Sequence, residues 1–211
     1  MGITDFSVSL LNKIFEKYPN IKTVAELGDQ NLYTVGVNYG KYANIFYEDK
    51  GLEYICLDAN GGNNALKVDL SKLFQLTNDP LPELHPEYND KKQFDLVTDF
   101  GVSEHIKING QFDWEGIYNC WLNKHNLLKV GGITISENPK TKNWNRHGYN
   151  YYTEEFYKEL VSFADYEIIE LGEVCAMGNC TDGKNIYAIM QKKSEKFATF
   201  EEFKTLDIRT L

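Results

Sequence analysis

Acidic residues and one glycine stand at the ends of hydrophobic runs that have the length and composition of β-strands. Glu26 lies near the end of the run 21–27, Gly28 follows that run directly, and Asp58 follows the run 52–57. A glycine in such a turn lets a ligand approach the backbone closely, and an aspartate there can accept hydrogen bonds from both hydroxyls of a ribose. Three further runs each end in an acid: Asp69, Asp99 and Glu137. These residue types predict a site for a ligand that contains a nucleoside.

The turn after the first of these runs argues against a dinucleotide. A dinucleotide-binding turn that began at Gly28 would need glycines at positions 30 and 33, but the chain has Gln30 and Tyr33 there. The turn therefore lacks a glycine-rich cradle for a pyrophosphate, and a nicotinamide-dependent reductase is disfavoured.

The strands that must position these residues alternate with helices along the chain. Apolar residues at helical spacing predict helices over 5–18, 39–49 and 112–129, the last ended by Gly131-Gly132, and Thr153 is placed to cap a fourth helix. Strands are predicted over 21–27, 52–57, 66–69, 94–99, 133–136, 166–171 and 186–190. This alternation predicts an α/β fold with a doubly wound, mostly parallel seven-stranded sheet and helices on both faces.

The last strand is expected to run antiparallel. The segment 172–185 has no helical period, and a right-handed parallel crossover needs a helix or a similarly long connection. We therefore expect six parallel strands and a final hairpin, in one domain over 1–211: an N-terminal helix (1–20), a core (21–191) and a C-terminal extension (192–211).

Composition narrows the choice of partners. The formal net charge of the 211 residues is −9, and arginine occurs twice, at Arg146 and Arg209, which disfavours nucleic acid. The apolar runs are too short for a membrane span, and the N-terminus does not have the pattern of a signal peptide. The four scattered cysteines predict reduced thiols in the cytoplasm and no zinc site.

Five short motifs, in this order, resemble the class I S-adenosylmethionine-dependent methyltransferases. They are Val24-Ala-Glu-Leu-Gly28, Asp58, Val68-Asp69-Leu70, Phe94-Asp-Leu-Val-Thr-Asp-Phe-Gly101 and Leu128-Lys-Val-Gly-Gly132. Each motif alone is weak, and the specific feature is their order and spacing over about residues 21–191. The antiparallel last strand, expected above without the family, agrees with the resemblance.

The resemblance implies an enzyme with S-adenosyl-L-methionine as cofactor. Glu26 and Gly28 would border the methionine part, and Asp58 would bind the ribose hydroxyls. The remaining implied positions are Asp69 and Leu70 beside the adenine, and Asp99 and Phe100 on the sulfonium and acceptor side. The chain departs from the family in two ways: its first loop keeps one glycine, and residues 31–38 look like an insertion that would form a flap over the ligand.

The residues after the fourth strand bear on the acceptor. Methyltransferases of amino groups commonly carry a proline-containing step there, but this chain has Asp99-Phe100-Gly101-Val102 and no proline. Ser103-Glu104-His105 follows, and it resembles the acid and histidine of many small-molecule methyltransferases. His105 or Glu104 could take a proton from an acceptor hydroxyl, and His147 is a further candidate. These residues favour O-methylation of a small-molecule or saccharide-type acceptor, with no metal ion expected. The alternatives are a non-catalytic binding module with this fold, or methylation of a protein or nucleic acid.

Overall fold

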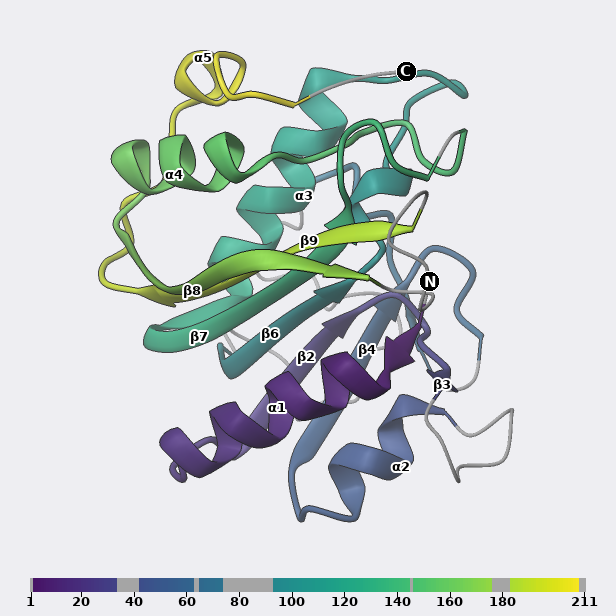
Figure 1. Cartoon of the computed structure of the whole chain (residues 1–211), viewed down its shortest axis with the longest axis vertical. Helices are drawn as coiled ribbons and strands as arrows, with labels where there is room; N and C mark the ends of the chain where they lie inside the picture. The colour runs from purple at the N-terminus through teal and green to yellow at the C-terminus, as the bar shows by residue number, and fades with distance from the viewer. Residues whose placement is uncertain are drawn as a thin grey trace.

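The computed structural model describes residues 2–33, 42–62, 65–73, 93–144, 146–175 and 183–208 (Figure 1). The strands are β1 (Ile3–Thr4), β2 (Thr23–Leu27), β3 (Leu32–Tyr33), β4 (Glu53–Asp58), β5 (Leu66–Lys67), β6 (Phe94–Phe100), β7 (Leu128–Pro139), β8 (Tyr166–Cys175) and β9 (Lys184–Lys192). The helices are α1 (Asp5–Lys17), α2 (Ala43–Glu48), α3 (Trp114–Leu127), α4 (Glu154–Phe163), α5 (Phe200–Phe203) and the short 3-10 helix η2 (Ser103–His105).

Seven strands form the main sheet in the order β5-β4-β2-β6-β7-β9-β8. The pairs from β5 to β7 are parallel, and β9 pairs antiparallel with β7 on one side and with β8 on the other. The predicted α/β sheet with one antiparallel last strand is therefore confirmed. The order of strands reverses between β2 and β6, because β4 and β5 are added on one side of β2, and β6 and β7 on the other. This reversal creates a crevice at the carboxyl ends of β2 and β6.

Helices cover both faces of this sheet (Figure 1). On one face, α1 and α2 bury Leu10, Leu11 and Tyr47 against β2, β6 and β7. On the other face, α3, α4 and α5 form an aromatic core around Trp121 and Phe156. Successive side chains of a strand point to opposite faces of the sheet and so pack in different cores. The face on which a strand residue lies therefore determines which residues it can contact.

Threonine side chains fix the starts of two helices. The Thr4 hydroxyl accepts a hydrogen bond from the backbone N–H of Ser7 at the start of α1, and the Thr153 hydroxyl accepts one from Phe156 at the start of α4. Each bond satisfies a backbone donor that the helix itself leaves free. The predicted helix over 5–18 and the predicted cap at Thr153 are confirmed.

The predicted end of α3 is wrong. We expected the helix to continue to residue 129 and to stop at Gly131-Gly132, but it ends at Leu127 and both glycines lie within β7. Leu128 already pairs with Phe94 of β6, whereas the next regular pair joins Ile133 to Leu96. Because pairing with the sheet begins at Leu128, the helix ends before it reaches the glycines. Gly131 and Gly132 lie instead in the irregular part of the pairing near the start of β7.

The predicted helix over 39–49 is confirmed only in its second part, as α2. The flap proposed for 31–38 begins with β3, which pairs with β1, and its residues 34–38 lie outside the described part of the chain.

The cysteines differ from the expectation of reduced thiols at one position. Cys56 and Cys120 are free and buried, whereas Cys175 at the end of β8 is disulfide-bonded. The scattered spacing in the sequence gave no signal for this bond. Disulfides are rare in the cytosol, so the cytoplasmic location stays a prediction.

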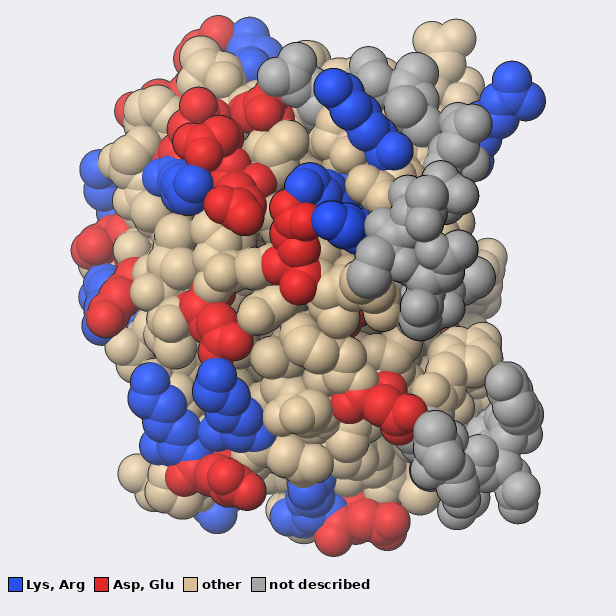
Figure 2. Space-filling model, viewed as in Figure 1, with Lys and Arg blue, Asp and Glu red and all other residues tan. Residues whose placement is uncertain are grey.

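The surface carries charges of both signs. On the face that Figure 2 shows, basic and acidic side chains lie interspersed among neutral ones. No helix in the described ranges is both long and apolar enough to cross a bilayer.

Candidate functional site

A cavity of about 470 Å³ opens at the carboxyl ends of β2, β4, β5 and β6. This is the crevice at which doubly wound sheets bind ligands, and the volume is in the range of small-molecule sites. Four segments contribute to its walls: 28–30, 58–60, 69–71 and the run after β6 (101–102 and 105–107). Of the predicted cofactor residues, four line it: Gly28, Asp58, Asp69 and Leu70.

Gly28 forms the tight turn that follows β2. Its φ is +82°, in the left-handed region, and its backbone N–H donates to the carbonyl oxygen of Leu57 at 2.7 Å. A Cβ atom at this position would lie 2.4 Å from Cγ2 of Val102 and 2.6 Å from Nε2 of Gln30. Glycine therefore suits both the backbone angle and the space that Val102 and Gln30 leave at this position.

Asp58 ends β4 and is held by two backbone donors. Its Oδ2 accepts from the N–H of Asp29 at 3.2 Å, and its Oδ1 accepts from the N–H of Asn60 at 2.7 Å. A carboxylate offers about four acceptor positions, so each oxygen keeps a free one. The side chain is thus fixed at the cavity wall and is still able to accept hydrogen bonds from a ligand.

Asp69 and Leu70 lie in the turn after β5. The Oδ1 of Asp69 accepts from the hydroxyl and from the N–H of Ser71, at 2.6 and 3.1 Å, and these bonds lower the pKa of the Asp69 carboxyl. The carbonyl oxygen of Leu70 accepts from Nδ2 of Asn123 in α3 at 3.3 Å. The turn is thereby attached to α3, which makes it a firm wall of the cavity.

Glu26 does not line the cavity. Its side chain is fully buried on the α1 and α2 face, where it accepts hydrogen bonds from the hydroxyls of Tyr54 at 2.6 Å, Tyr47 at 3.3 Å and Thr98 at 3.4 Å. Burial raises the pKa of this carboxyl to about 8, against the opposing effect of the hydroxyl donors. The structure therefore places Glu26 below the cavity floor rather than beside a ligand.

Asp99 and Phe100 at the end of β6 are also fully buried, and neither lines the cavity. Phe100 packs in the core under α1. The Oδ1 of Asp99 accepts from the N–H groups of Val102 and Ser103, at 3.1 and 3.2 Å, and its Oδ2 lies 3.8 Å from Nζ of the buried Lys124. Asp99 thus shapes the turn into η2, which carries the next residues of the site.

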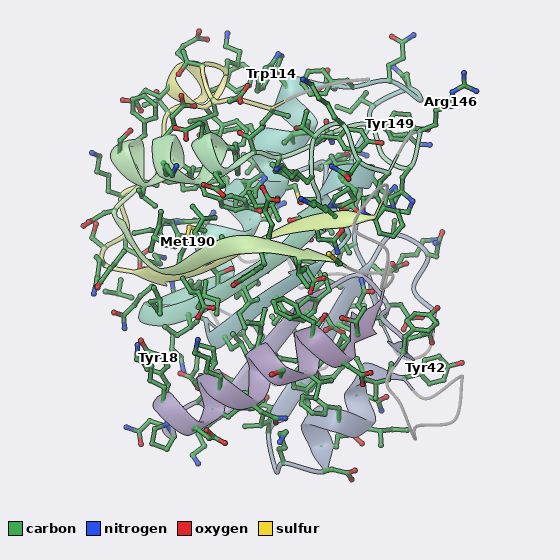
Figure 3. All side chains as sticks on the ribbon, viewed as in Figure 1. Tyr18, Tyr42, Trp114, Arg146, Tyr149 and Met190 are labelled. Atoms are coloured by element: carbon green, nitrogen blue, oxygen red, sulfur yellow. The ribbon has the colours of Figure 1, made fainter. Side chains whose placement is uncertain are left out.

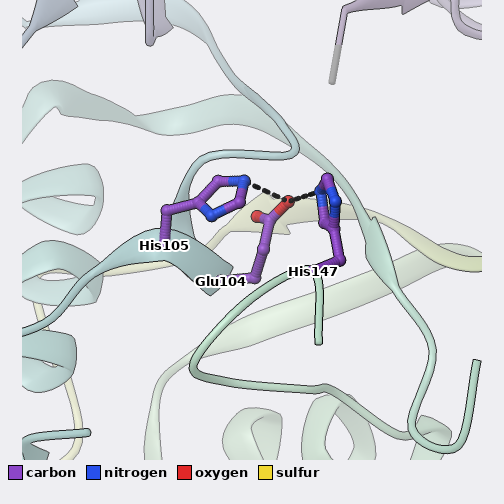
Figure 4. Close-up of side chains that lie close together, drawn as sticks. All are labelled: Glu104, His105 and His147. Carbon is purple, nitrogen blue, oxygen red and sulfur yellow. Dashed lines mark ion pairs between the residues drawn. The ribbon is translucent and has the colours of Figure 1, made fainter. Parts of the chain in front are cut away.

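Glu104, His105 and His147, the three predicted catalytic residues, come together at one rim of the cavity (Figure 4). The Oε1 of Glu104 lies 3.6 Å from Nε2 of His105 and 3.8 Å from Nε2 of His147. The glutamate side chain is fully buried, whereas those of His105 and His147 are 41% and 29% exposed. His105 also lines the cavity, so this cluster adjoins it.

Burial controls the ionisation of this cluster. It raises the pKa of Glu104, with a further contribution from the negative charge of Asp99. It lowers the pKa of His105 to about 4, helped by the neighbouring His147, and lowers the pKa of His147 as well. At neutral pH both imidazoles are therefore uncharged and can accept a proton or another ligand.

The loop 140–152 brings His147 to η2, although the two lie far apart in the sequence. The N–H groups of Tyr149 and Asn150 donate to the carbonyl oxygen of Glu104 at 2.8 and 3.2 Å, and Nδ2 of Asn150 donates to the carbonyl oxygens of Ser103 and Ile106. A Cβ at Gly148 would lie 2.9 Å from Cγ of Glu104, so glycine permits this approach.

In the same loop, three residues other than glycine have backbone angles in the left-handed region, which favours glycine. Lys142, Trp144 and Arg146 have φ values of +67°, +56° and +59°. Such residues are uncommon and cluster at functional sites. Arg146 is exposed and extends away from the body of the molecule, whereas Tyr149 lies against it, where its hydroxyl accepts from Nζ of Lys107 at 2.9 Å (Figure 3).

Sequence reasoning missed several residues at the site. Gln30, Val102 and Lys107 line the cavity, and Asn138 holds Glu104 through a bond from Nδ2 to Oε2 of 3.2 Å. Asn138 follows Glu137 at the end of β7, so the strand-end pattern could have found it. Glu137 itself is buried away from the cavity, where it accepts from Ser7 and Asn185.

Comparison with known proteins supports the fold. No protein-family model and no curated protein matches the sequence. Among solved structures, a 1,6-didemethyltoxoflavin-N1-methyltransferase of Burkholderia thailandensis, with 1,6-didemethyltoxoflavin and S-adenosylhomocysteine bound, superposes with a TM-score of 0.56 at 13% identity, over 87% of this chain and 76% of that chain. The N-methyltransferase NodS of Bradyrhizobium japonicum gives a TM-score of 0.50 at 12% identity, over 89% of this chain and 94% of that chain. With its sheet order and its single antiparallel strand, the chain has the fold of the class I S-adenosylmethionine-dependent methyltransferases.

Proposed function

We propose that this protein is an S-adenosylmethionine-dependent methyltransferase that methylates a hydroxyl of a small-molecule acceptor. One observation carries the proposal: Gly28, Asp58 and His105 line the same cavity at the crevice of the sheet. The first two are the residue types that a nucleoside-containing cofactor needs, and the third belongs to a cluster that can handle a proton.

The residues around the cavity fit this cofactor. Asp58 has free acceptor positions for the two ribose hydroxyls, and Gly28 lines the same cavity without a side chain. Val102 and Ile106 supply apolar surface between the polar walls. The firmly held turn 69–71 would border the adenine.

Little covalent chemistry is required of the chain. S-adenosylmethionine, when bound, supplies a methyl group attached to a sulfonium sulfur, and the sulfur keeps the electron pair of the carbon–sulfur bond when the methyl group is transferred. The protein must hold the acceptor oxygen in line with that bond and accept the hydroxyl proton. His105, uncharged and partly exposed at the rim, is the proposed base, and Glu104 and His147 orient it.

One feature favours a second candidate, a binding module without turnover. Where the family carries further glycines, Gln30 is nearly buried and its Nε2 donates to the carbonyl oxygen of Leu27 at 3.3 Å. The Gln30 side chain therefore reduces the space that the loop after β2 leaves for a ligand. Binding of the cofactor product without methylation of any acceptor in a broad panel would support this candidate.

Titration of the purified protein with S-adenosylhomocysteine by calorimetry tests the proposal. We expect micromolar binding, a loss of at least about tenfold in affinity in Asp58→Ala, and unchanged binding in Asp49→Ala, which removes an exposed aspartate after α2. NAD serves as the alternative nucleotide. Binding of NAD in place of S-adenosylhomocysteine, or no binding by a folded wild-type protein, would contradict the proposal.

A further inference from the structure

The Oε1 atom of Glu104 is a buried acceptor for which the described part of the chain supplies no hydrogen-bond donor. The Nε2 atom of His147, which faces it, is also buried and unpartnered in this region. An unsatisfied buried carboxylate oxygen is costly, so a native site that keeps one calls for an explanation. Figure 4 shows that both imidazoles turn their Nε2 atoms toward this oxygen.

The distances within the cluster fit an ion better than hydrogen bonds. The two separations of 3.6 and 3.8 Å exceed hydrogen-bond length. Ligand atoms about 2.1 Å from a shared tetrahedral ion lie about 3.4 Å apart. All three candidate ligand atoms lie within 4.8 Å of one another, so the widest pair would have to close by up to about 1.4 Å for the three atoms to share one tetrahedral ion.

We propose that Glu104, His105 and His147 bind one divalent transition-metal ion through Oε1 and the two Nε2 atoms. Two imidazoles and one carboxylate suit ions such as Zn²⁺, Co²⁺ or Fe²⁺, whereas Mg²⁺ and Ca²⁺ prefer oxygen ligands alone. This site replaces the sequence-based expectation that the protein has no metal.

The surroundings hold the three ligands as a metal site requires. Asn138 donates to the other oxygen of Glu104 and so orients the carboxylate. The hydroxyl of Tyr151 accepts from the N–H groups of His147 and Gly148, at 3.0 and 2.9 Å, which fixes the backbone next to the second imidazole. The Trp144 ring packs on the His147 ring with their centres 5.1 Å apart.

Three protein ligands leave coordination positions open, as in metal sites that act on a substrate. Because His105 lines the cavity, an open position can face it. An acceptor whose hydroxyl oxygen binds there would have the pKa of that hydroxyl lowered by the ion, and it could release its proton to solvent before it takes the methyl group. With a metal bound, the ion would replace His105 as the group that activates the hydroxyl. This last step rests on the proposed function; the metal site itself does not.

Zinc binding by tag-free protein, freed of metal with a chelator, tests the site. Calorimetric titration with Zn²⁺ should give one equivalent bound, and Co²⁺ should give a visible absorption band. Glu104→Gln keeps the shape of the side chain and should weaken zinc binding by at least about 100-fold, as should His147→Gln. Glu115→Gln, which changes an exposed glutamate of α3, is the matched control and should bind as the wild type does.

The two proposals fail separately. A wild-type protein that is folded by circular dichroism but takes up neither Zn²⁺ nor Co²⁺ would overturn the metal site, as would uptake that Glu104→Gln leaves unchanged. S-adenosylhomocysteine binding, measured on the same metal-free samples, reports on the cofactor cavity alone.

Discussion

Glu26 is the residue whose burial has the clearest consequence for stability. Its pKa in the folded protein is about 8, above its ordinary value of 4.5, so the folded state binds the proton more tightly than the unfolded state. The resulting stability is fully present below about pH 4.5 and is lost as the pH rises to about 8. By linkage this loss is on the order of 5 kcal/mol.

Glu26→Gln should remove this pH dependence, because the amide has the same shape and does not ionise. Urea unfolding at pH 5 and at pH 8 checks it: wild type should lose stability between the two values relative to the variant. Glu115→Gln should follow the wild type. If the free energy of unfolding changes by the same amount between pH 5 and pH 8 in Glu26→Gln and in the wild type, the prediction is wrong and Glu26 ionises in the folded protein as it does in the unfolded one.

Gly28 can be separated from an ordinary turn glycine by a matched pair of substitutions. Gly28→Ala adds a Cβ at 2.4 Å from Val102 to a backbone that alanine disfavours, whereas Gly51→Ala, at φ +70°, meets nothing within 4 Å. Both should lose about 1–2 kcal/mol from the backbone. We expect Gly28→Ala to lose more stability than Gly51→Ala in urea, and it alone should lose S-adenosylhomocysteine binding.

At the scale of elements, the junction between η2 and the loop 140–152 assembles the cluster. Asn150 joins them, because its Nδ2 donates to the carbonyl oxygens of Ser103 and Ile106 at 3.2 and 3.0 Å. Asn150→Ala should leave these acceptors without their donor and cost about 1–3 kcal/mol of unfolding free energy. The exposed Asn20→Ala should change it by less than about 0.5 kcal/mol. Equal stability of the two variants in urea would refute this role.

The helices and strands also show which structural features could be predicted from the sequence and which could not. Apolar runs and capping residues predicted α1, α4 and the seven strands of the main sheet, because burial and capping act locally, but they did not predict β1 and β3. The end of α3 could not be predicted, since it depends on pairing between Leu128 and Phe94. Strand-end acids predicted the edge of the sheet at which the cavity opens. They could not predict that Glu26 and Phe100 turn toward the α1 face, because a strand alternates its side chains and the sequence alone does not assign its faces.

At the scale of the whole molecule, the order of strands in the sheet differs from their order in the chain. β9 lies between β7 and β8, although it follows both in the sequence. Long-range pairings of this kind form late, since the intervening chain must first be ordered.

During synthesis on the ribosome this topology imposes an order of events. β7 and β8 emerge before β9, so until β9 has been made, β7 can pair only with β6, and β8 has no partner. Until then the nascent chain exposes an unpaired edge at β7, the strand that carries Asn138 toward the cluster. The arrival of β9 thus closes the sheet and completes the support of the site in a single late step.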